Sequence, residues 1–182
     1  MQTQFADAPD AQRKLALPDI TLVAIDTIAH ELTALSIADC RKHATFGDVK
    51  LFTNVKGMPH GVYVPGMNGH RALLDFTIYW MPDYIKTSHI LVAQWDSWIV
   101  DSGMWRPDFL RYDYVGAPWG FTDGMNVGNS GFSILSKALL DFIAARPERF
   151  VSLGWSASRQ RPRGRKFAIA FQGHQASLPE PR

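Results

Sequence analysis

The sequence predicts an α/β fold in which helices cover both faces of a mostly parallel sheet. Three observations support this prediction. Short apolar runs rich in β-branched residues, typical of buried parallel strands, occur at 20–25 and 90–94. Between them, residues 30–44 carry apolar side chains at helical spacing. A further strand-like run follows at 49–53, which completes a βαβ unit.

The remaining elements continue this alternation. Glycine and proline divide residues 57–69 into turns, with a short strand expected at 62–66. Residues 70–85 have a helical pattern that Pro82 should end, because proline lacks the amide proton a helix needs. Further along, we expect an apolar strand piece at 98–100, a helical turn at 105–110, strands at 112–116 and 131–135, and a helix at 137–145.

Length and composition favour one globular unit. A chain of 182 residues with 46% hydrophobic content can bury one substantial core. We divide it into an irregular segment at 1–16, an α/β domain at 17–145 and a basic, atypical tail at 146–182. The sequence has no apolar run near 18 residues and no basic-then-apolar start. We therefore expect neither a membrane span nor a signal peptide, and a cytoplasmic location.

Charge and cysteine content narrow the classes of function. Residues 145–182 hold 8 Lys or Arg against 2 Asp or Glu, although the whole chain has a net charge of only +2. This basic tail could contact an anionic partner, but its Pro, Gly and Ser content favours a solvated segment, and we expect no nucleic-acid partner. Cys40 is the single cysteine, which excludes an intramolecular disulfide and a multi-cysteine zinc site.

A carboxylate at the end of a predicted buried strand is the sharpest functional candidate. Asp96 follows the strand at 90–94, and ligands in open α/β sheets bind beyond the carboxyl ends of strands. Hard divalent cations there prefer carboxylate oxygens. Asp96 could equally cap a turn, as Asp often does after a strand. Asp101 could share the ion, but we favour a structural role that ends the 98–100 piece.

Asp26 ends the first predicted strand in the same way, followed by Thr27. Its carboxylate could accept hydrogen bonds from a ribose or a base, or it could cap the helix that follows. Both roles are compatible. His30 lies near the start of that helix and is better interpreted as a surface or capping residue.

A glycine-flanked loop precedes the strand at 131–135. Its sequence is Gly128-Asn129-Ser130-Gly131, and glycine lets backbone amides approach an oxyanion or a sugar hydroxyl closely. A plain turn is the alternative. Three nearby aromatic side chains could stack on a base or a sugar, or could belong to the core: Trp105, Trp119 and Phe121. The sequence contains no Walker loop, Ser/His/Asp arrangement or metal-binding histidine pair.

Four blocks in order, within residues 17–142, resemble the DUF5672 family of uncharacterised, mostly bacterial proteins. They are Leu17 to Thr27, Thr87 to Asp96, Phe109 to Trp119 and Val127 to Ser133. The resemblance implies a GT-A-like fold, that of the nucleotide-diphospho-sugar transferases. It also implies a divalent cation, Mn²⁺ or Mg²⁺, a nucleotide-sugar donor, and a glycan or another hydroxyl compound as acceptor.

The same resemblance suggests roles for individual residues. Gln94-Trp95-Asp96 stands where GT-A enzymes carry an Asp-x-Asp motif, which gives Asp96 the metal and leaves Gln94 in place of the first Asp. The nucleotide would lie against Gln94 and Trp95 and against two residues of the first strand end, Asp26 and Thr27. The donor sugar or the acceptor would lie against Trp119, Gly128, Asn129, Ser130 and Gly131.

Departures from the family pattern lead to two hypotheses. Ser130 replaces a glycine, Ile134-Leu135 replaces Leu-Arg, and the tail lacks an expected acidic pair. The first hypothesis is a metal-dependent glycosyltransferase, with Asp123 as the nearest candidate for the general base. The second is a catalytically inactive, truncated sugar- or nucleotide-binding module with a basic interaction tail.

Overall fold

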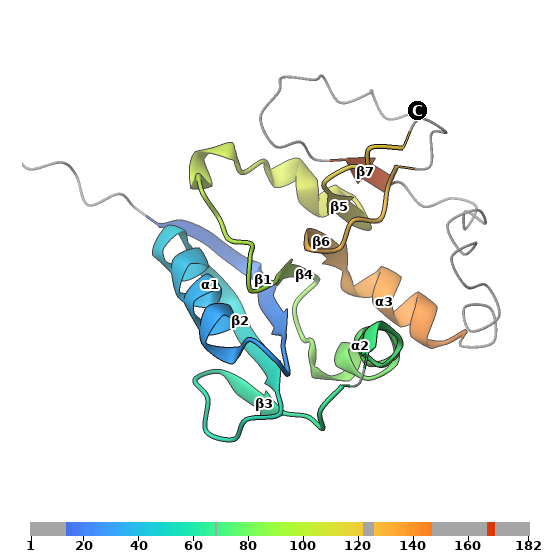
Figure 1. The fold of residues 1–182 in the computed structure, drawn as a ribbon. Coiled ribbons are helices and arrows are strands. Elements are labelled where there is room, and N and C mark those ends of the chain that lie inside the picture. The colour runs from blue at the N-terminus through green and yellow to red at the C-terminus, as the bar shows by residue number, and fades with distance from the viewer. Residues whose placement is uncertain (1–13, 68, 122–125, 147–166, 170–182) are drawn as a thin grey trace, which may run out of the picture.

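The computed structural model describes residues 14–67, 69–121, 126–146 and 167–169 (Figure 1). Seven strands of this part form one sheet in the order β3-β2-β1-β4-β6-β5-β7. The strands are β1 (Leu15–Ile25), β2 (Ala44–Thr53), β3 (Gly61–Tyr63), β4 (His89–Ala93), β5 (Tyr114–Gly116), β6 (Phe132–Ser136) and β7 (Phe167–Ile169). The α-helices are α1 (His30–His43), α2 (Gly69–Tyr79) and α3 (Lys137–Ala144). Short 3-10 helices lie at Met81–Tyr84, Ser102–Met104 and Pro107–Arg111.

The α/β class is confirmed, but the sheet is mixed rather than mostly parallel. β6 runs antiparallel to both of its neighbours, β4 and β5, whereas the pairs β1-β2, β1-β4, β2-β3 and β5-β7 are parallel. A parallel neighbour requires a crossover connection, while an antiparallel one requires only a loop at one edge. In the described part of residues 117–131, the link from β5 to β6 contains no helix. The chain therefore enters β6 at the same end of the sheet at which it left β5.

The strand order places a topological switch between β1 and β4. The chain moves outward from β1 to β2 and β3, and then crosses to β4 on the other side of β1. The segments after both central strands lie on the α1 face, because α1 follows β1, Ser36 of α1 donates to the Ser97 carbonyl after β4, and Ile99 packs in the same cluster as Ile37. The carboxyl ends of β1 and β4 lie side by side at the switch point.

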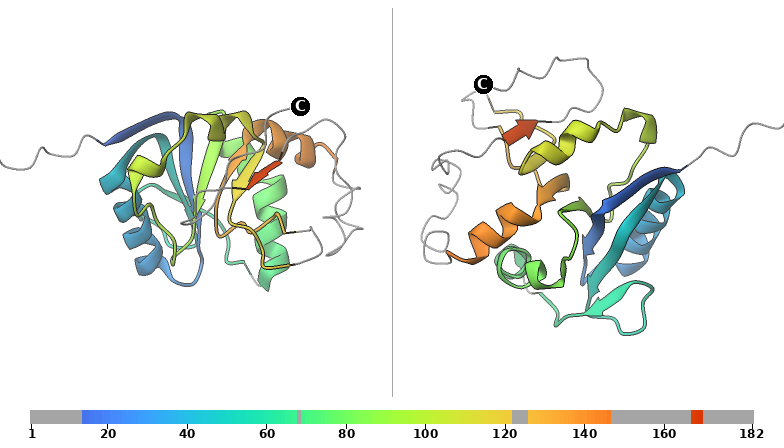
Figure 2. Two further views of the ribbon diagram at one scale, coloured as in Figure 1. Left: turned by 90° about the horizontal axis from the view of Figure 1, so that it is seen from above. Right: turned by 180° about the vertical axis from the view of Figure 1, so that it is seen from behind.

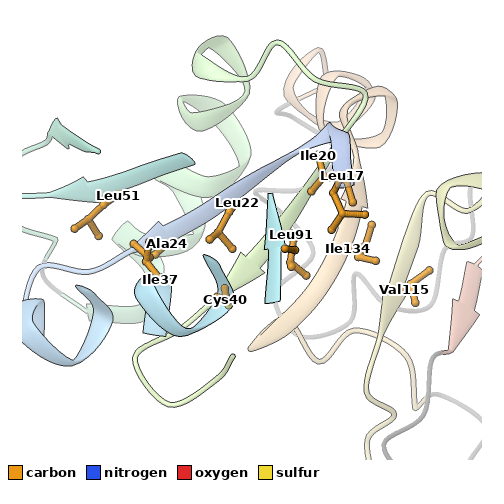
Figure 3. Packing of buried hydrophobic residues seen from close by; sticks show 12 residues of the cluster. Leu17, Ile20, Leu22, Ala24, Ile37, Cys40, Leu51, Leu91, Val115 and Ile134 are labelled. Carbon is orange, nitrogen blue, oxygen red and sulfur yellow. The ribbon is translucent and has the colours of Figure 1, made fainter. Parts of the chain in front are cut away.

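Helices cover both faces of the sheet, as predicted. Figure 2 shows α1 on one face and α2 with α3 on the other. Because side chains alternate along a strand, Leu22 and Ala24 of β1 pack with Ile37 and Cys40 of α1, as Figure 3 shows. Val23 faces the opposite way, into a second cluster that also includes Phe52, Met81, Ile90 and Leu140.

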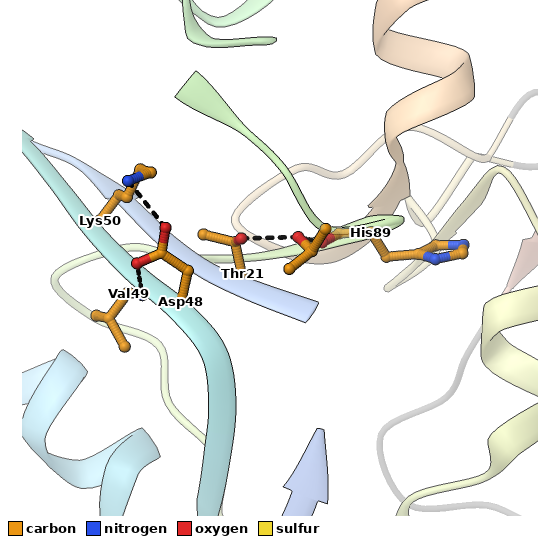
Figure 4. Close-up of polar contacts among 6 residues, drawn as sticks. Thr21, Asp48, Val49, Lys50 and His89 are labelled. Atoms are coloured by element: carbon orange, nitrogen blue, oxygen red, sulfur yellow. Dashed lines mark hydrogen bonds and ion pairs between the residues drawn. The ribbon is translucent and has the colours of Figure 1, made fainter. Parts of the chain in front are cut away.

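Polar contacts fix the amino-terminal part of the sheet, away from the switch point. Thr21 Oγ1 and Thr87 Oγ1 lie 2.7 Å apart, and Lys50 pairs with Asp48 at 2.9 Å (Figure 4). His89 begins β4 at this end, and its ring points away from Thr21. Burial lowers the pKa of His89 below its usual value. The buried His89 side chain is therefore part of the fold at the end of the sheet opposite Asp26.

Two predicted elements differ from the structure. The helix expected over 70–85 ends at Tyr79, and Pro82 lies in the following 3-10 helix, where its fixed φ is accommodated. The apolar piece expected at 98–100 forms no strand. Of its three residues, only Ile99 packs against the core, so the segment has too little apolar contact to join the sheet.

The described helices include none that is long and apolar enough to cross a membrane.

Candidate functional site

The structure brings three of the predicted segments to the same end of the sheet, where β1 and β4 finish. Val23 pairs with Val92, so β1 and β4 end side by side, with Asp26 after one and Gln94 after the other. Ala93 pairs with Phe132, which places the loop at 128–131 next to the end of β4. Residues distant in sequence therefore come together at the switch point.

Asp96 lies at this end of the sheet and is exposed to solvent. No hydrogen bond or ion pair joins its carboxylate to any of the described residues. The capping role that was the alternative for Asp96 is therefore not observed in this part of the chain. Trp95 beside it is also exposed. The carboxylate is available to an external cation or hydrogen-bond donor.

Ser97, which the sequence analysis did not single out, organises the turn that carries Asp96. Its Oγ accepts a hydrogen bond from the Gln94 amide at 2.8 Å and donates one to the Gly131 carbonyl at 3.0 Å. The Ser97 amide donates to the Gln94 carbonyl at 3.1 Å. Ser36 of α1 donates from its hydroxyl to the Ser97 carbonyl. The turn is thus bound to β4, to α1 and to the loop before β6.

The carboxylate of Asp26 mainly holds the chain that follows β1. Its Oδ1 accepts from the amides of Ile28 and Ala29 at 2.6 and 2.7 Å, and its Oδ2 accepts from the Thr33 hydroxyl. The N-cap residue of α1 is Ala29, without a side-chain cap, so Asp26 orders the turn before the helix and is not the cap itself. Both carboxylate oxygens already have partners. A ligand at this strand end would meet the ordered turn as well as the carboxylate.

Two further contacts connect neighbouring strand ends. Thr27 accepts a hydrogen bond on Oγ1 from the Met67 amide at 3.5 Å, which links the turn after β1 to the segment after β3. His30 Nε2 and Asn54 Oδ1 lie 2.7 Å apart. Asn54 follows β2 directly, and the sequence analysis missed it although it occupies the same kind of strand-end position as Asp26. Polar residues therefore follow both β1 and β2 at this end of the sheet.

The loop at 128–131 is fixed by tertiary contacts. Gly128 has φ of +123°, a conformation that disfavours residues with a Cβ. Asn129 Oδ1 accepts from the Gly131 amide at 3.2 Å, and the Tyr114 hydroxyl donates to the Asn129 carbonyl. A Cβ at Gly131 would lie 3.5 Å from Gln94 Oε1, so the Gln94 side chain faces this loop. The loop is therefore more than a plain turn, because it packs against two neighbouring strand ends.

The three candidate aromatic side chains divide into two groups. Trp105 is half-buried, packs against the core and meets Phe109 edge to face at 5.4 Å. It is a core residue. Trp119 and Phe121 are exposed and stacked, with ring centroids 5.9 Å apart and planes inclined by 29°. Of these three side chains, Trp119 and Phe121 are therefore the ones placed to contact a ligand.

Two candidate carboxylates remain, those of Asp101 and Asp123. Asp101 Oδ1 accepts from the Gly103 amide at 2.8 Å and caps a 3-10 helix, in line with the favoured structural role. Asp123 lies outside the described residues. No group of three or more His, Cys, Asp or Glu side chains with metal-binding geometry occurs in the described part. A cation at Asp96 would need most of its ligands from outside this part of the protein.

Comparison with known proteins gives one family. The model described as "Protein of unknown function (DUF5672)" matches residues 62–167, more than half of the chain. The match includes β4, the turn with Asp96, the Trp119 segment and the loop at 128–131. No curated protein matches this chain.

Proposed function

This chain belongs to the DUF5672 family, and from that premise and the arrangement of the strand ends at the switch point we propose that it is a metal-dependent glycosyltransferase with a GT-A-like fold. The reaction would transfer a sugar from a nucleotide-sugar donor to a hydroxyl group of an acceptor. The observation that carries this proposal is the carboxylate of Asp96, which is exposed and has no partner among the described residues. It stands at the end of the strand that borders the switch point.

The sheet topology supports the fold part of the proposal. The order β3-β2-β1-β4, continued by the antiparallel strand β6, places the carboxyl ends of β1 and β4 side by side at a switch point, where open α/β sheets commonly bind ligands. Strand β6 then brings a loop to the same end of the sheet. Such a loop suits a bisubstrate site, because the donor can lie against the ends of β1 and β4 while the loop faces the transferred sugar.

The donor set at Asp96 fits Mg²⁺ or Mn²⁺ bound together with a diphosphate. Mg²⁺ is commonly held by one or two carboxylates, with substrate phosphates and water completing the coordination. Among the described residues at these strand ends, Asp96 offers one carboxylate without a partner, and there is no closed cage of acidic side chains. When bound, the ion would supply electrostatic stabilisation of the departing nucleotide diphosphate. Asp96 would hold it at the end of β4.

The nucleotide would lie nearest the end of β1. Asp26 and Thr27 present an ordered turn there, with the Asp26 carboxylate fixed by two amides and a hydroxyl. Gln94 and the exposed Trp95 border the other side. A ribose or a base could hydrogen bond to the polar groups of the turn and pack against the indole ring of Trp95.

The transferred sugar and the acceptor would lie toward β6 and β5. The loop residues Gly128 to Gly131 contribute exposed backbone and polar side chains on this side. If the enzyme inverts configuration, a carboxylate must remove the acceptor proton. Asp123 stays a prediction for that role because it lies outside the described residues.

Calorimetric titration with uridine and guanosine diphosphate sugars, with and without Mn²⁺, tests the proposal. We expect Mn²⁺-dependent binding by the wild type and at least a tenfold loss in Asp96→Asn, which keeps the shape but removes the charge. Asp101→Asn is the matched control, because Asn can still accept the Gly103 hydrogen bond at this exposed position. Absence of heat with every donor, or equal binding by Asp96→Asn, would overturn the proposal.

The inactive-module hypothesis makes a different prediction. Binding through the basic cluster of Arg159, Arg161, Arg163, Arg165 and Lys166 would be lost when these residues are changed to Ser, and it would survive in Asp96→Asn. Substitution is preferable to deletion of the tail, because β7 (Phe167–Ile169) pairs with β5 in the sheet. A transferase would show the reverse pattern, with donor binding kept after the tail substitutions.

A further inference from the structure

Two stacked aromatic side chains stand exposed at the carboxyl end of β5. Trp119 is 39% exposed and Phe121 is 51% exposed, although large aromatic side chains are usually well buried. Their planes lie within 29° of each other. The pair therefore presents aromatic surface to solvent.

The pair is attached to the loop at 128–131. The Trp119 amide donates to the Asn126 carbonyl at 2.6 Å, and its indole Nε1 lies 4.0 Å from the position that a Cβ on Gly128 would occupy. The Tyr114 hydroxyl in turn ties the Asn129 carbonyl to β5. The aromatic surface and the polar loop are thus neighbours held by the same strand.

Strand spacing separates this surface from the proposed nucleotide position. β5 is three strands from β1 and two from β4 in the sheet order. Neighbouring strands lie about 4.8 Å apart, so the end of β5 is about 14 Å from the end of β1 and about 10 Å from the end of β4. The donor at the end of β1 and the aromatic pair after β5 would therefore lie on opposite sides of β4.

We propose that the acceptor is a carbohydrate and that one of its pyranose rings stacks on Trp119. This inference rests on the proposed transferase function. A pyranose has an apolar face of C–H groups and a rim of hydroxyls, which matches an aromatic surface beside the polar residues Asn129 and Ser130. A lipid chain would leave these polar groups without hydrogen bonds, and that would weaken its binding.

Affinity electrophoresis and calorimetry with soluble hexasaccharides of glucose, N-acetylglucosamine, mannose and galactose test this inference. The wild type should bind at least one of them. Trp119→Ala should lower the association constant by at least about tenfold, equivalent to 1.4 kcal/mol. Trp80→Ala, which removes an indole that is 64% exposed after α2, is the matched control and should bind like the wild type. Thermal unfolding of each variant shows that the fold is kept.

The same variants separate this inference from the transferase proposal. Donor binding with Mn²⁺ should be unchanged in Trp119→Ala. If Trp119→Ala loses donor binding instead, the indole contacts the donor and the inference is overturned. If the wild type binds a donor but none of the hexasaccharides, the carbohydrate acceptor is overturned and the transferase proposal stands. If it binds a hexasaccharide through Trp119 but no donor, stacking is supported and the transferase proposal fails.

Discussion

The hydroxyl of Ser97 donates a hydrogen bond to the backbone carbonyl of Gly131 at 3.0 Å, across 34 residues of sequence. This contact joins the turn that carries Asp96 to the loop that faces Gln94. The same oxygen accepts a hydrogen bond from the Gln94 amide, so the Ser97 hydroxyl joins the end of β4 to the loop at 128–131. The position of Asp96 relative to the loop therefore depends on Ser97.

Replacing Ser97 with alanine should destabilise the turn that carries Asp96. The change leaves the Gln94 amide and the Gly131 carbonyl without their partner in a half-buried region, at a cost of about 1–3 kcal/mol in the free energy of unfolding. Urea denaturation measures this loss. Ser130→Ala removes an exposed hydroxyl from the adjoining loop and should change the stability by less than about 0.5 kcal/mol. Equal stabilities of the two variants would contradict the role of Ser97.

Gly116 should tolerate no side chain. A Cβ there would lie 2.5 Å from the Tyr114 hydroxyl and 2.9 Å from the Asn129 carbonyl, so Gly116→Ala should displace the loop at 128–131. We expect a loss of about 1–3 kcal/mol from overpacking, measured by thermal or urea unfolding. Gly120→Ala is the control, because nothing lies within 4 Å of its added methyl group. A neutral Gly116→Ala would show that this approach is not close in solution.

Tyr114 should make stability fall at alkaline pH. Burial raises the pKa of its phenol to about 12. Because this folded-state value lies above the value of about 10 in the unfolded chain, the contribution is complete below pH 10 and is lost as the pH rises toward 12. Tyr114→Phe should remove this part of the pH dependence, which is on the order of 1 kcal/mol between pH 8 and pH 11. The comparison is the difference in unfolding free energy between the two proteins at pH 8 and pH 11. A constant difference would contradict the assignment.

Much of the fold could be predicted from the sequence because its strands are locally distinct. The β-branched run in β1 and the helical spacing in α1 were enough to place a βαβ unit. The direction of β6 was not predictable in this way. The pattern of Phe132 to Ser136 is the same for either direction, and the direction depends on whether the connection from β5 crosses a face of the sheet or stays at one edge.

The candidate site was predictable only where it depends on strand ends. Asp26 and Asp96 follow apolar runs, so the sequence alone identified both. Ser36 and Ser97 are 61 residues apart, and their contact depends on how α1 packs on the sheet. Serine has too many local roles for either residue to be recognised without that packing.

Cys40 should be almost unreactive in the folded protein. It is buried against β1, and burial raises the pKa of its thiol from 9 to about 11. At pH 8 this shift reduces the thiolate, which is the reactive form, by about 100-fold. Labelling with a chromogenic disulfide reagent should therefore be at least that much slower in buffer than in guanidinium chloride. Rapid labelling of the native protein would mean that α1 opens without global unfolding.

The two strand-end carboxylates should differ in their contribution to folding. Asp26→Ala removes the acceptors of two amides and a hydroxyl, and should lower the free energy of unfolding by about 1–2 kcal/mol. Asp26→Asn should lose less, because its side-chain oxygen can still accept from the two amides. Asp96→Ala should change the stability by less than about 0.5 kcal/mol, because its carboxylate has no partner among the described residues.

Urea denaturation of the three variants, in buffer containing a chelator, measures this difference. The chelator matters because a bound cation would stabilise the folded wild type and would make Asp96 seem structural. Repeating the series with Mn²⁺ should then lower the relative stability of Asp96→Ala and leave that of Asp26→Ala unchanged. A large loss for Asp96→Ala in chelator would instead place its carboxylate in the fold itself, and would remove the main support for a cation at the end of β4.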